Sequence, residues 1–187
     1  MKSLRKKQTT WNLDPLFKDD NDSQIEKKKK IVERKSHEFI NKWKSRKDYF
    51  KKPIVLKQAL DEYENWQKNY GTGGDEGYYF WLRTMQDQND SELKAKFNKI
   101  MDFSNKIQTD VEFFTLSIAK IPLKSQKKFL EYKPLENYKH FIEKLFAEAR
   151  YLLSEAEEKI LTLQFTTSHL NWVKMTSGFL AKEERRV

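Results

Sequence analysis

The sequence holds few residues that could carry out metal-dependent catalysis. Its three histidines are His37, His140 and His169. A zinc peptidase with an H-E-x-x-H motif needs two histidines four residues apart on one helix face, and a glutamate beside the first as general base. His37 is followed by Glu38, but Asn41 stands where the second histidine should be, and Lys144 and Val173 stand four residues after the other two. Three histidines from separate helices would lack the local pair that catalytic zinc usually takes. We therefore predict no catalytic residue, no metal ligand and no cofactor in this chain.

Nucleophilic and phosphate chemistry also lack their residues. The chain has no cysteine and no Gly-x-Ser-x-Gly sequence, so neither a reactive thiol nor an activated serine is apparent. The glycine-rich stretch GTGGDEG, residues 71–77, contains four of the five glycines. A phosphate-binding loop of the Walker type needs Gly-Lys-Ser/Thr before a helix, whereas Asp75 and Glu76 occupy that place here. We predict that this stretch is a flexible link between helical hairpins.

The basic side chains are mostly lysines. The net charge is +9, and of the 37 basic residues 30 are lysine and seven are arginine. Arginine is the residue that contacts phosphate and guanine in a bidentate way, whereas lysines interleaved with acidic residues are typical of a solvated helix surface. Nucleic-acid binding is therefore expected to be weak and non-specific at most. A stand-alone basic helical module that binds nucleic acid or a partner protein remains the alternative function.

The composition indicates which elements position these residues. Aromatic residues make up 14% of the chain, which argues against disorder despite 35% charged residues. Five glycines and four prolines provide little material for the turns of a sheet. We predict an all-α fold, an array of antiparallel helical hairpins with about seven to eight helices and no sheet.

Apolar periodicity and capping signals give approximate helix positions. Ser23 with Glu26, and Asn89 with Glu92, have the spacing of capping boxes. Pro53 suits the first turn of a helix and Pro122 should end one. The predicted helical segments are Ser23 to about Phe50, Pro53 to about Tyr70, Tyr78–Leu82, Asn89 to about Ile118, Leu123–Leu130 and a helix from about Leu135, followed by two shorter helices. Because residues 78–82 are apolar all round, we expect them to be buried on several sides.

Residues 1–22 are predicted to form an N-terminal arm in front of a helical domain, residues 23–187. A charged tail is followed by four apolar residues around an Asp-Pro turn signal: Trp11, Leu13, Leu16 and Phe17. The simplest role for this group is to fix the arm onto the helices behind it. Exposure of Trp11 on a binding surface is the alternative.

The last two predicted helices contain the apolar face of most interest. Ser154 and Glu157 form a capping box for the first of them, and Thr167 or Ser168 can cap the second. Leu170 and Val173 lie near one side of the second helix, and Trp172, Met175 and Phe179 lie nearer another. One side can pack on the preceding helix, but the other has no later partner in this chain. We predict that Trp172, Met175 and Phe179 form an interdomain or partner face that is partly exposed or covered by a second copy, burial of both sides being the alternative.

Several stretches resemble a known family when they are taken in order. They are TTWNLDPLF (residues 9–17), FINKWKSRKDYF (39–50), ALDEYENW (59–66), FFTLSIAKIP (113–122), YLLSEAEEKIL (151–161) and TSHLNWV (167–173). Together they resemble the N-terminal helical region of the oligoendopeptidase F family of zinc metallopeptidases. The family's H-E-x-x-H helix is missing, so no catalytic residue is carried over.

The resemblance implies a zinc endopeptidase of short peptides as the parent enzyme, with this chain forming a wall of the substrate cleft. It implies that zinc and the general base lie in a C-terminal catalytic domain that is missing here, and that this chain is inactive alone. The sequence end AKEERRV has no closing cap, which makes a truncation at Val187 plausible. A helical scaffold without activity, descended from the peptidase, is a third alternative.

The remaining expectations concern compartment and association. The basic N-terminus has no apolar core of a signal peptide, no run approaches the length that spans a bilayer, and cysteine is absent. We therefore expect a soluble, cytoplasmic protein with no membrane contact. Self-association that covers the apolar face is one of two outcomes expected for this face, and partial exposure is the other.

Overall fold

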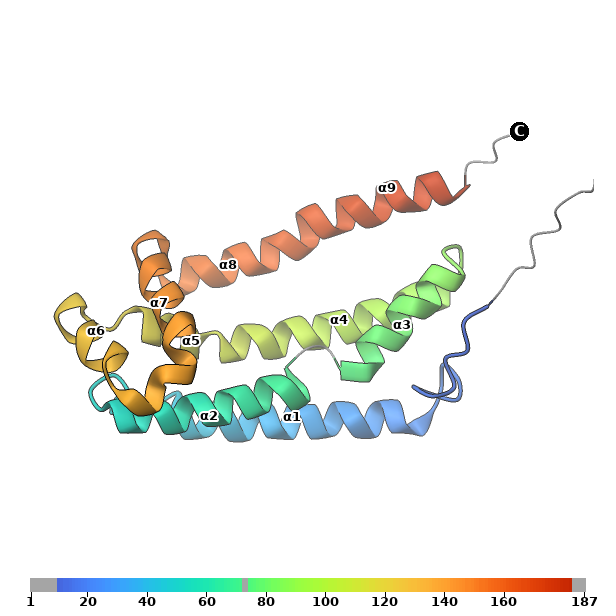
Figure 1. Cartoon of the computed structure of the whole chain (residues 1–187). Coiled ribbons are helices and arrows are strands. Elements are labelled where there is room, and N and C mark those ends of the chain that lie inside the picture. Colours follow the sequence, from blue (N-terminus) through green and yellow to red (C-terminus); the bar gives the residue numbers. More distant parts are fainter. Residues whose placement is uncertain (1–9, 72–73, 183–187) are drawn as a thin grey trace, which may run out of the picture.

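The computed structural model describes residues 10–71 and 74–182, and within these residues all regular secondary structure is helical (Figure 1). The segments are α1 Ser23–Trp43, α2 Pro53–Tyr70, α3 Gly74–Gln86, α4 Ser91–Val111, α5 Phe113–Ala119, α6 Leu123–Leu130, η1 Lys133–Tyr138, α7 Lys139–Glu148, η2 Ala149–Tyr151, α8 Glu155–Phe165, η3 Thr166–Leu170 and α9 Asn171–Lys182. The predicted all-α class is confirmed.

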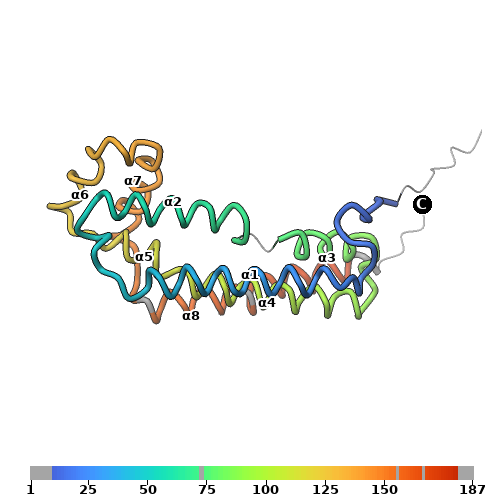
Figure 2. The backbone as a smooth tube through the Cα atoms, turned by 90° about the horizontal axis from the view of Figure 1, so that it is seen from below, coloured from blue at the N-terminus to red at the C-terminus, as the bar shows by residue number. Residues whose placement is uncertain are grey.

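The predicted number of seven to eight helices and their regular hairpin array are not confirmed. Several segments abut without a loop, such as α4 and α5 on either side of Glu112, so the elements are not a series of separate, equal helices. Figure 2 shows short segments around α6 and α7 gathered at one end of an elongated molecule, and α3 with the N-terminal arm at the other. The division into an arm, residues 1–22, and a helical domain, residues 23–187, stays a prediction, and residues 1–9 and 183–187 lie outside the described residues.

Local capping differs from the predicted positions by one residue. Asp22, not Ser23, caps α1, because its side chain accepts a hydrogen bond from the Gln24 backbone. Asp90, not Asn89, caps α4, because its side chain accepts hydrogen bonds from the backbone amides of Glu92 and Leu93. Aspartate, asparagine and serine are about equally good caps. Which of two neighbouring residues caps a helix therefore depends on how the apolar face of that helix meets the core. Pro53 begins α2 as expected, whereas α1 ends at Trp43 rather than near Phe50.

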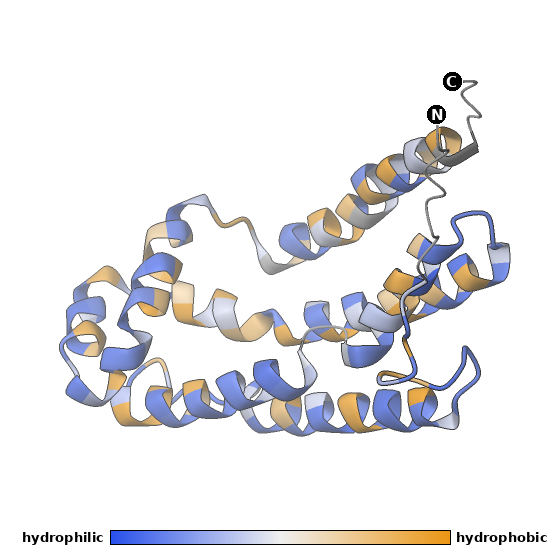
Figure 3. Cartoon of the chain, turned by 45° about the vertical axis from the view of Figure 1, so that its right-hand side comes forward, coloured by the Kyte–Doolittle hydropathy of each residue, from blue (hydrophilic) through white to orange (hydrophobic). Residues whose placement is uncertain are grey.

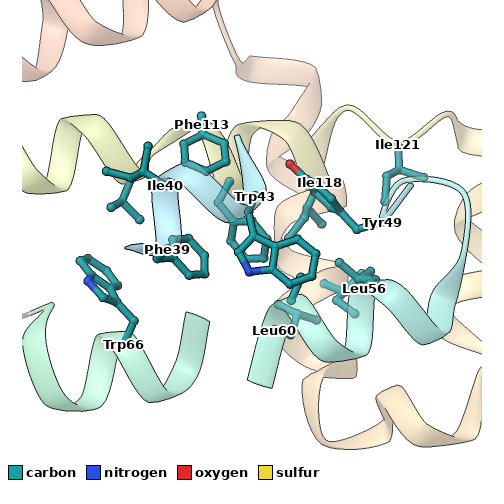
Figure 4. Packing of buried hydrophobic residues seen from close by; sticks show 14 of the residues in the cluster. Phe39, Ile40, Trp43, Tyr49, Leu56, Leu60, Trp66, Phe113, Ile118 and Ile121 are labelled. Atoms are coloured by element: carbon teal, nitrogen blue, oxygen red, sulfur yellow. The ribbon is translucent and has the colours of Figure 1, made fainter. Parts of the chain in front are cut away.

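The main core is an aromatic cluster where α1, α2, α5 and α7 meet (Figure 4). Phe114 is fully buried at its centre, with ring centroids 5.3 Å from Phe39, 4.9 Å from Tyr63 and 5.7 Å from Tyr49. Rings at these separations pack more favourably than their buried area alone suggests. The cluster gives many of the chain's aromatic residues a place in the core.

Two tryptophans of this core have hydrogen-bond partners for their indole nitrogens. The indole nitrogen of Trp66 donates to the Ser36 hydroxyl at 3.0 Å, and that hydroxyl donates to the Val32 carbonyl at 2.7 Å. The indole nitrogen of Trp43 donates to a Glu62 carboxylate oxygen at 2.9 Å. Because an unpaired buried donor costs about 1–3 kcal/mol, these bonds fix the positions of both indoles.

A second, smaller cluster attaches the N-terminal arm to α3 and α4. Phe17 is buried there with Ile25, Phe80 and Ile100, and its ring meets that of Tyr79 edge-on at 5.3 Å. Leu13 and Leu16 pack against the same cluster, whereas Trp11 is exposed. The predicted role of these residues in fixing the arm is therefore confirmed for three of the four residues, and the alternative role of Trp11 on a binding surface stays a prediction.

A polar network reinforces this attachment. The Asp20 carboxylate accepts hydrogen bonds from Arg83 at 2.8 and 2.9 Å and from the Tyr79 hydroxyl at 2.8 Å. Lys96 donates to the Asp20 backbone carbonyl at 3.1 Å. The Arg83 hydrogen bond, and after it the Tyr79 bond, hold the pKa of Asp20 below its ordinary value against the opposing effect of partial burial.

Asp20→Asn should destabilise the fold in a pH-dependent way. Since the folded-state pKa of Asp20 is lowered, its contribution is present above the unfolded pKa of about 3.9 and is lost as the pH falls through the folded value. Above about pH 5 the substitution is expected to lower the unfolding free energy by roughly 1–3 kcal/mol, the cost of leaving polar partners unsatisfied. Urea unfolding from pH 2 to pH 7 checks this, and a difference that is constant over this range would contradict the role of the Asp20 charge.

The expectation that residues 78–82 are buried on several sides is wrong for two of them. Tyr79, Phe80 and Leu82 are buried, but Tyr78 and Trp81 are exposed and stack on each other with centroids 5.8 Å apart. The run belongs to the longer helix α3, so successive residues point to different sides. The side of α3 that carries Tyr78 and Trp81 faces away from α4, and no element among the described residues covers these two side chains.

Candidate functional site

The C-terminal helical arm is the part of the chain that separates most clearly from the rest. We use this name for α8, the π-helical turn η3 and α9 together, which form one unbroken helix from residue 155 to residue 182. In Figure 1 the arm leaves the body near α7 and extends alongside α4. Its N-terminus has the predicted capping box: the Ser154 amide donates to Glu157 at 2.8 Å, and the Glu157 amide donates to the Ser154 hydroxyl at 3.4 Å.

The predicted start of a separate last helix at Thr167 or Ser168 is wrong. Neither residue caps a helix, because the chain passes through η3 without interruption. Both hydroxyls instead donate back to the Gln164 carbonyl, at 3.1 Å from Thr167 and 2.6 Å from Ser168. Hydroxyl side chains often satisfy carbonyls of the preceding turn in this way. The π turn widens the helix by one residue and is a feature frequently found at functional sites.

The apolar side chains of the arm lie largely in solvent. Trp172, Met175 and Phe179 are 63%, 45% and 65% exposed. The other exposed large apolar residues of the arm are Ile160, Leu161, Leu163, Phe165, Val173 and Leu180. Figure 3 shows hydrophobic positions distributed along the arm. The exposure therefore agrees with the expectation for Trp172, Met175 and Phe179, while their role as an interdomain or partner face stays a prediction.

Few contacts connect the arm to the body of the protein. The Lys174 ammonium donates to the Asn98 side chain at 2.9 Å and lies 5.4 Å from the centre of the Phe97 ring. Ser177 and Leu180 face the turn between α3 and α4 across a hollow of about 540 Å³. These contacts set the direction of the arm, but they leave most of its apolar surface uncovered.

A second exposed apolar stripe lies on α3. Tyr78, Trp81 and Met85 are all exposed, and their spacing of three and four residues places them on one helix face. Met85 lines the same hollow as Leu180 of the arm. Sequence analysis missed this stripe because Tyr78 and Trp81 lie in an apolar run that suggests burial, although the three-and-four spacing of the three residues was a usable signal.

The histidines do not form a site. His37 lies on α1, His140 on α7 and His169 on η3, and all three are exposed. His169 stacks on Phe165 with ring centres 5.2 Å apart. No group of three histidines, aspartates or glutamates in the described ranges is placed to hold a metal ion. Within those ranges, no helix is long and apolar enough to cross a membrane.

Part of the basic surface is neutralised by ion pairs with nearby acidic side chains. Lysines pair with acids one helix turn away at Lys57–Asp61, Lys96–Glu92 and Lys144–Glu148. Binding to DNA is therefore expected to be weak and to fall by orders of magnitude between about 50 and 200 mM salt, as for non-specific phosphate contacts. Fluorescence anisotropy with two unrelated duplexes checks this. Sequence-selective binding that survives about 200 mM salt would instead support the nucleic-acid-binding alternative.

Comparison with known proteins gives a family match that covers the segments from α6 to α7 and most of the arm. Residues 118–177 match the family model described as Oligopeptidase F, N-terminal region. The resemblance to the N-terminal region of this family is confirmed. The matched segment runs from the end of α5 to the greater part of α9, and it includes Trp172 and Met175. No curated protein and no solved structure matches the chain. The resembling stretches before residue 113, and residues 113–117 of the next one, lie outside the match and remain predictions.

Proposed function

We propose that this chain is the N-terminal, cleft-forming part of an oligoendopeptidase F-like zinc metalloendopeptidase of short peptides, and that it is not catalytic by itself. The observation that carries the proposal is the uncovered apolar surface of the C-terminal helical arm inside the segment that matches the family. The partner is a catalytic domain that carries the H-E-x-x-H helix.

The energetics of the arm support an interdomain role. Covering a Trp, Met or Phe side chain contributes roughly 1.5–3 kcal/mol, and monomeric proteins rarely leave more than a few hundred Å² of contiguous apolar surface open. Trp172, Met175 and Phe179 recur at spacings of three and four along α9, so one partner surface can cover all three. A catalytic domain packed against this face would place the arm beside the cleft.

The residues present do not fit the zinc ion of the parent family. The histidines lie on three different elements, and the described residues contain no group of metal ligands. The proposal therefore assigns no step of peptide hydrolysis to this chain. Its assigned role is to bind the catalytic domain and to shape the substrate cleft.

A binding measurement tests the proposed partner. The chain is titrated with a separately produced catalytic domain of the family that carries H-E-x-x-H, and the dissociation constant is measured by calorimetry. A variant with Trp172→Ser, Met175→Ser and Phe179→Ser is expected to bind at least about 100-fold more weakly, because central apolar contacts of an interface each contribute about 1–2 kcal/mol or more.

The control is Leu123→Ser, which changes a residue of α6 that is 83% exposed and lies outside the arm. Binding by this control should equal that of the parent chain. Equal binding by the triple variant and the control would refute the assignment of the interface to the arm.

A further inference from the structure

A groove on the body of the protein joins α2 to the start of α7. Its floor consists of Leu60, Tyr63 and Phe141, and its rim carries Glu64, Gln67, Lys68 and Tyr138. The volume is about 530 Å³, which lies within the usual range of small-ligand sites. The floor is held in place because Tyr63 packs on Phe114 at 4.9 Å and on Phe141 at 6.4 Å.

The Tyr138 hydroxyl stands between two carboxylates at the rim. Its oxygen is 2.8 Å from Asp61 and 2.5 Å from Glu64. Burial, followed by the two carboxylates, raises the pKa of Tyr138, so the hydroxyl keeps its proton at neutral pH. One hydroxyl has only one proton to donate, so one of the two exposed carboxylates is left to water or to another partner.

The chain supplies that partner for one of the two carboxylates. The Lys57 ammonium bonds to both oxygens of Asp61, at 2.7 and 2.6 Å, and lies 5.7 Å from the centre of the Tyr138 ring. A carboxylate and an aromatic ring together thus hold a cation on the Asp61 side of the hydroxyl. On the other side, Glu64 has no ion pair in the part of the chain that the structure describes, and Lys68, one helix turn on, does not reach it.

We propose that the groove binds a basic side chain of a polypeptide, with its cationic group at Glu64 and Tyr138 and its apolar stem on Tyr63 and Phe141. An arginine suits the site best, because a guanidinium is planar, weakly hydrated and able to stack on aromatic rings while it bonds a carboxylate. A small inorganic cation would leave the apolar floor uncovered. This proposal does not depend on the C-terminal arm or on its partner.

The test uses the full chain and a capped tripeptide, acetyl-Ala-Arg-Ala-amide, followed by NMR titration of backbone amides. The matched probe replaces arginine with citrulline, which has nearly the same shape without the charge. We expect the arginine peptide to shift the amides around Glu64, Tyr138 and Phe141 with a dissociation constant in the millimolar range. The citrulline peptide and the free guanidinium ion should bind several-fold more weakly.

Two variants locate the site. Glu64→Gln removes the charge from an exposed residue and should weaken arginine-peptide binding roughly three- to fivefold, the usual effect of an exposed charge pair. Phe141→Leu should weaken it roughly two- to fivefold through loss of the aromatic ring. Glu33→Gln on α1 is the matched control and should leave binding unchanged. The proposal is overturned if the arginine and citrulline peptides bind equally, if Glu64→Gln binds as well as the control, or if no amide of the groove shifts.

Discussion

The isolated chain should leave short peptides uncleaved, with or without added zinc. Enzymes accelerate their reactions by at least about 10⁶-fold, and no group of three histidines, aspartates or glutamates in the described ranges is placed to hold a metal ion. Peptide hydrolysis in the presence of the chain is therefore expected at the uncatalysed rate. A fluorogenic peptide mixture and mass spectrometry provide the measurement, and the zinc content after dialysis against metal-free buffer provides an independent one.

The control for this prediction is His37→Ala, the only histidine followed by a glutamate. The substitution should change neither the zinc content nor the absence of cleavage. Near-stoichiometric zinc in the dialysed protein, together with cleavage that His37→Ala abolishes, would show that the chain is itself a metallopeptidase.

Among single substitutions outside the C-terminal helical arm, Phe114→Ala should cause the largest decrease in the free energy of unfolding. Phe114 is fully buried, and its ring contacts those of Phe39, Tyr49 and Tyr63. Removing a phenyl ring from such a site typically costs about 3–5 kcal/mol, because the cavity cannot close completely. Urea unfolding monitored by far-UV circular dichroism gives the difference in unfolding free energy.

Phe179→Ala is the matched control, since it makes the same chemical change on the exposed face of α9. Surface substitutions usually change stability by less than about 0.5 kcal/mol. If Phe179→Ala destabilised the isolated chain as much as Phe114→Ala, the face would be buried within a single chain or a self-associated form. Sedimentation velocity would distinguish these two, and only burial within the single chain would remove the basis for an interdomain surface.

The features that sequence analysis predicted well depend on local chemistry. The capping box at Ser154 and Glu157, the start of α2 at Pro53 and the all-helical class follow from propensities and spacings of a few residues. The arm's apolar face could also be predicted, because more apolar residues lie on it than one neighbouring helix can cover.

Features that depend on tertiary register could not be predicted in this way. Asp22 and Ser23 are both good caps, and only the packing of α1 decides between them. The exposure of Trp81 depends on which side of α3 meets α4, which an apolar run does not reveal. The continuity of α8 and α9 through η3 was missed because hydroxyl residues suit both a cap and a bond to the preceding turn.

The groove illustrates a further limit of sequence analysis. Tyr138 lies 74 residues from Glu64 and 77 from Asp61, and no spacing rule connects them. Each residue alone reads as part of an ordinary solvated helix surface. Only the packing of η1 against α2 places a single hydroxyl between two carboxylates above an aromatic floor.

Reconstituted peptide cleavage tests the central claim most directly. A catalytic domain of the family that carries H-E-x-x-H, produced without its N-terminal region, is assayed on a short fluorogenic peptide with and without this chain. The chain should raise kcat/KM at least about tenfold, the effect expected when a missing wall of a substrate cleft is restored and positions the substrate. The variant with Trp172→Ser, Met175→Ser and Phe179→Ser should not raise it. Equal cleavage with and without the chain, at concentrations where calorimetry shows both parts to be bound, would contradict a cleft-forming role.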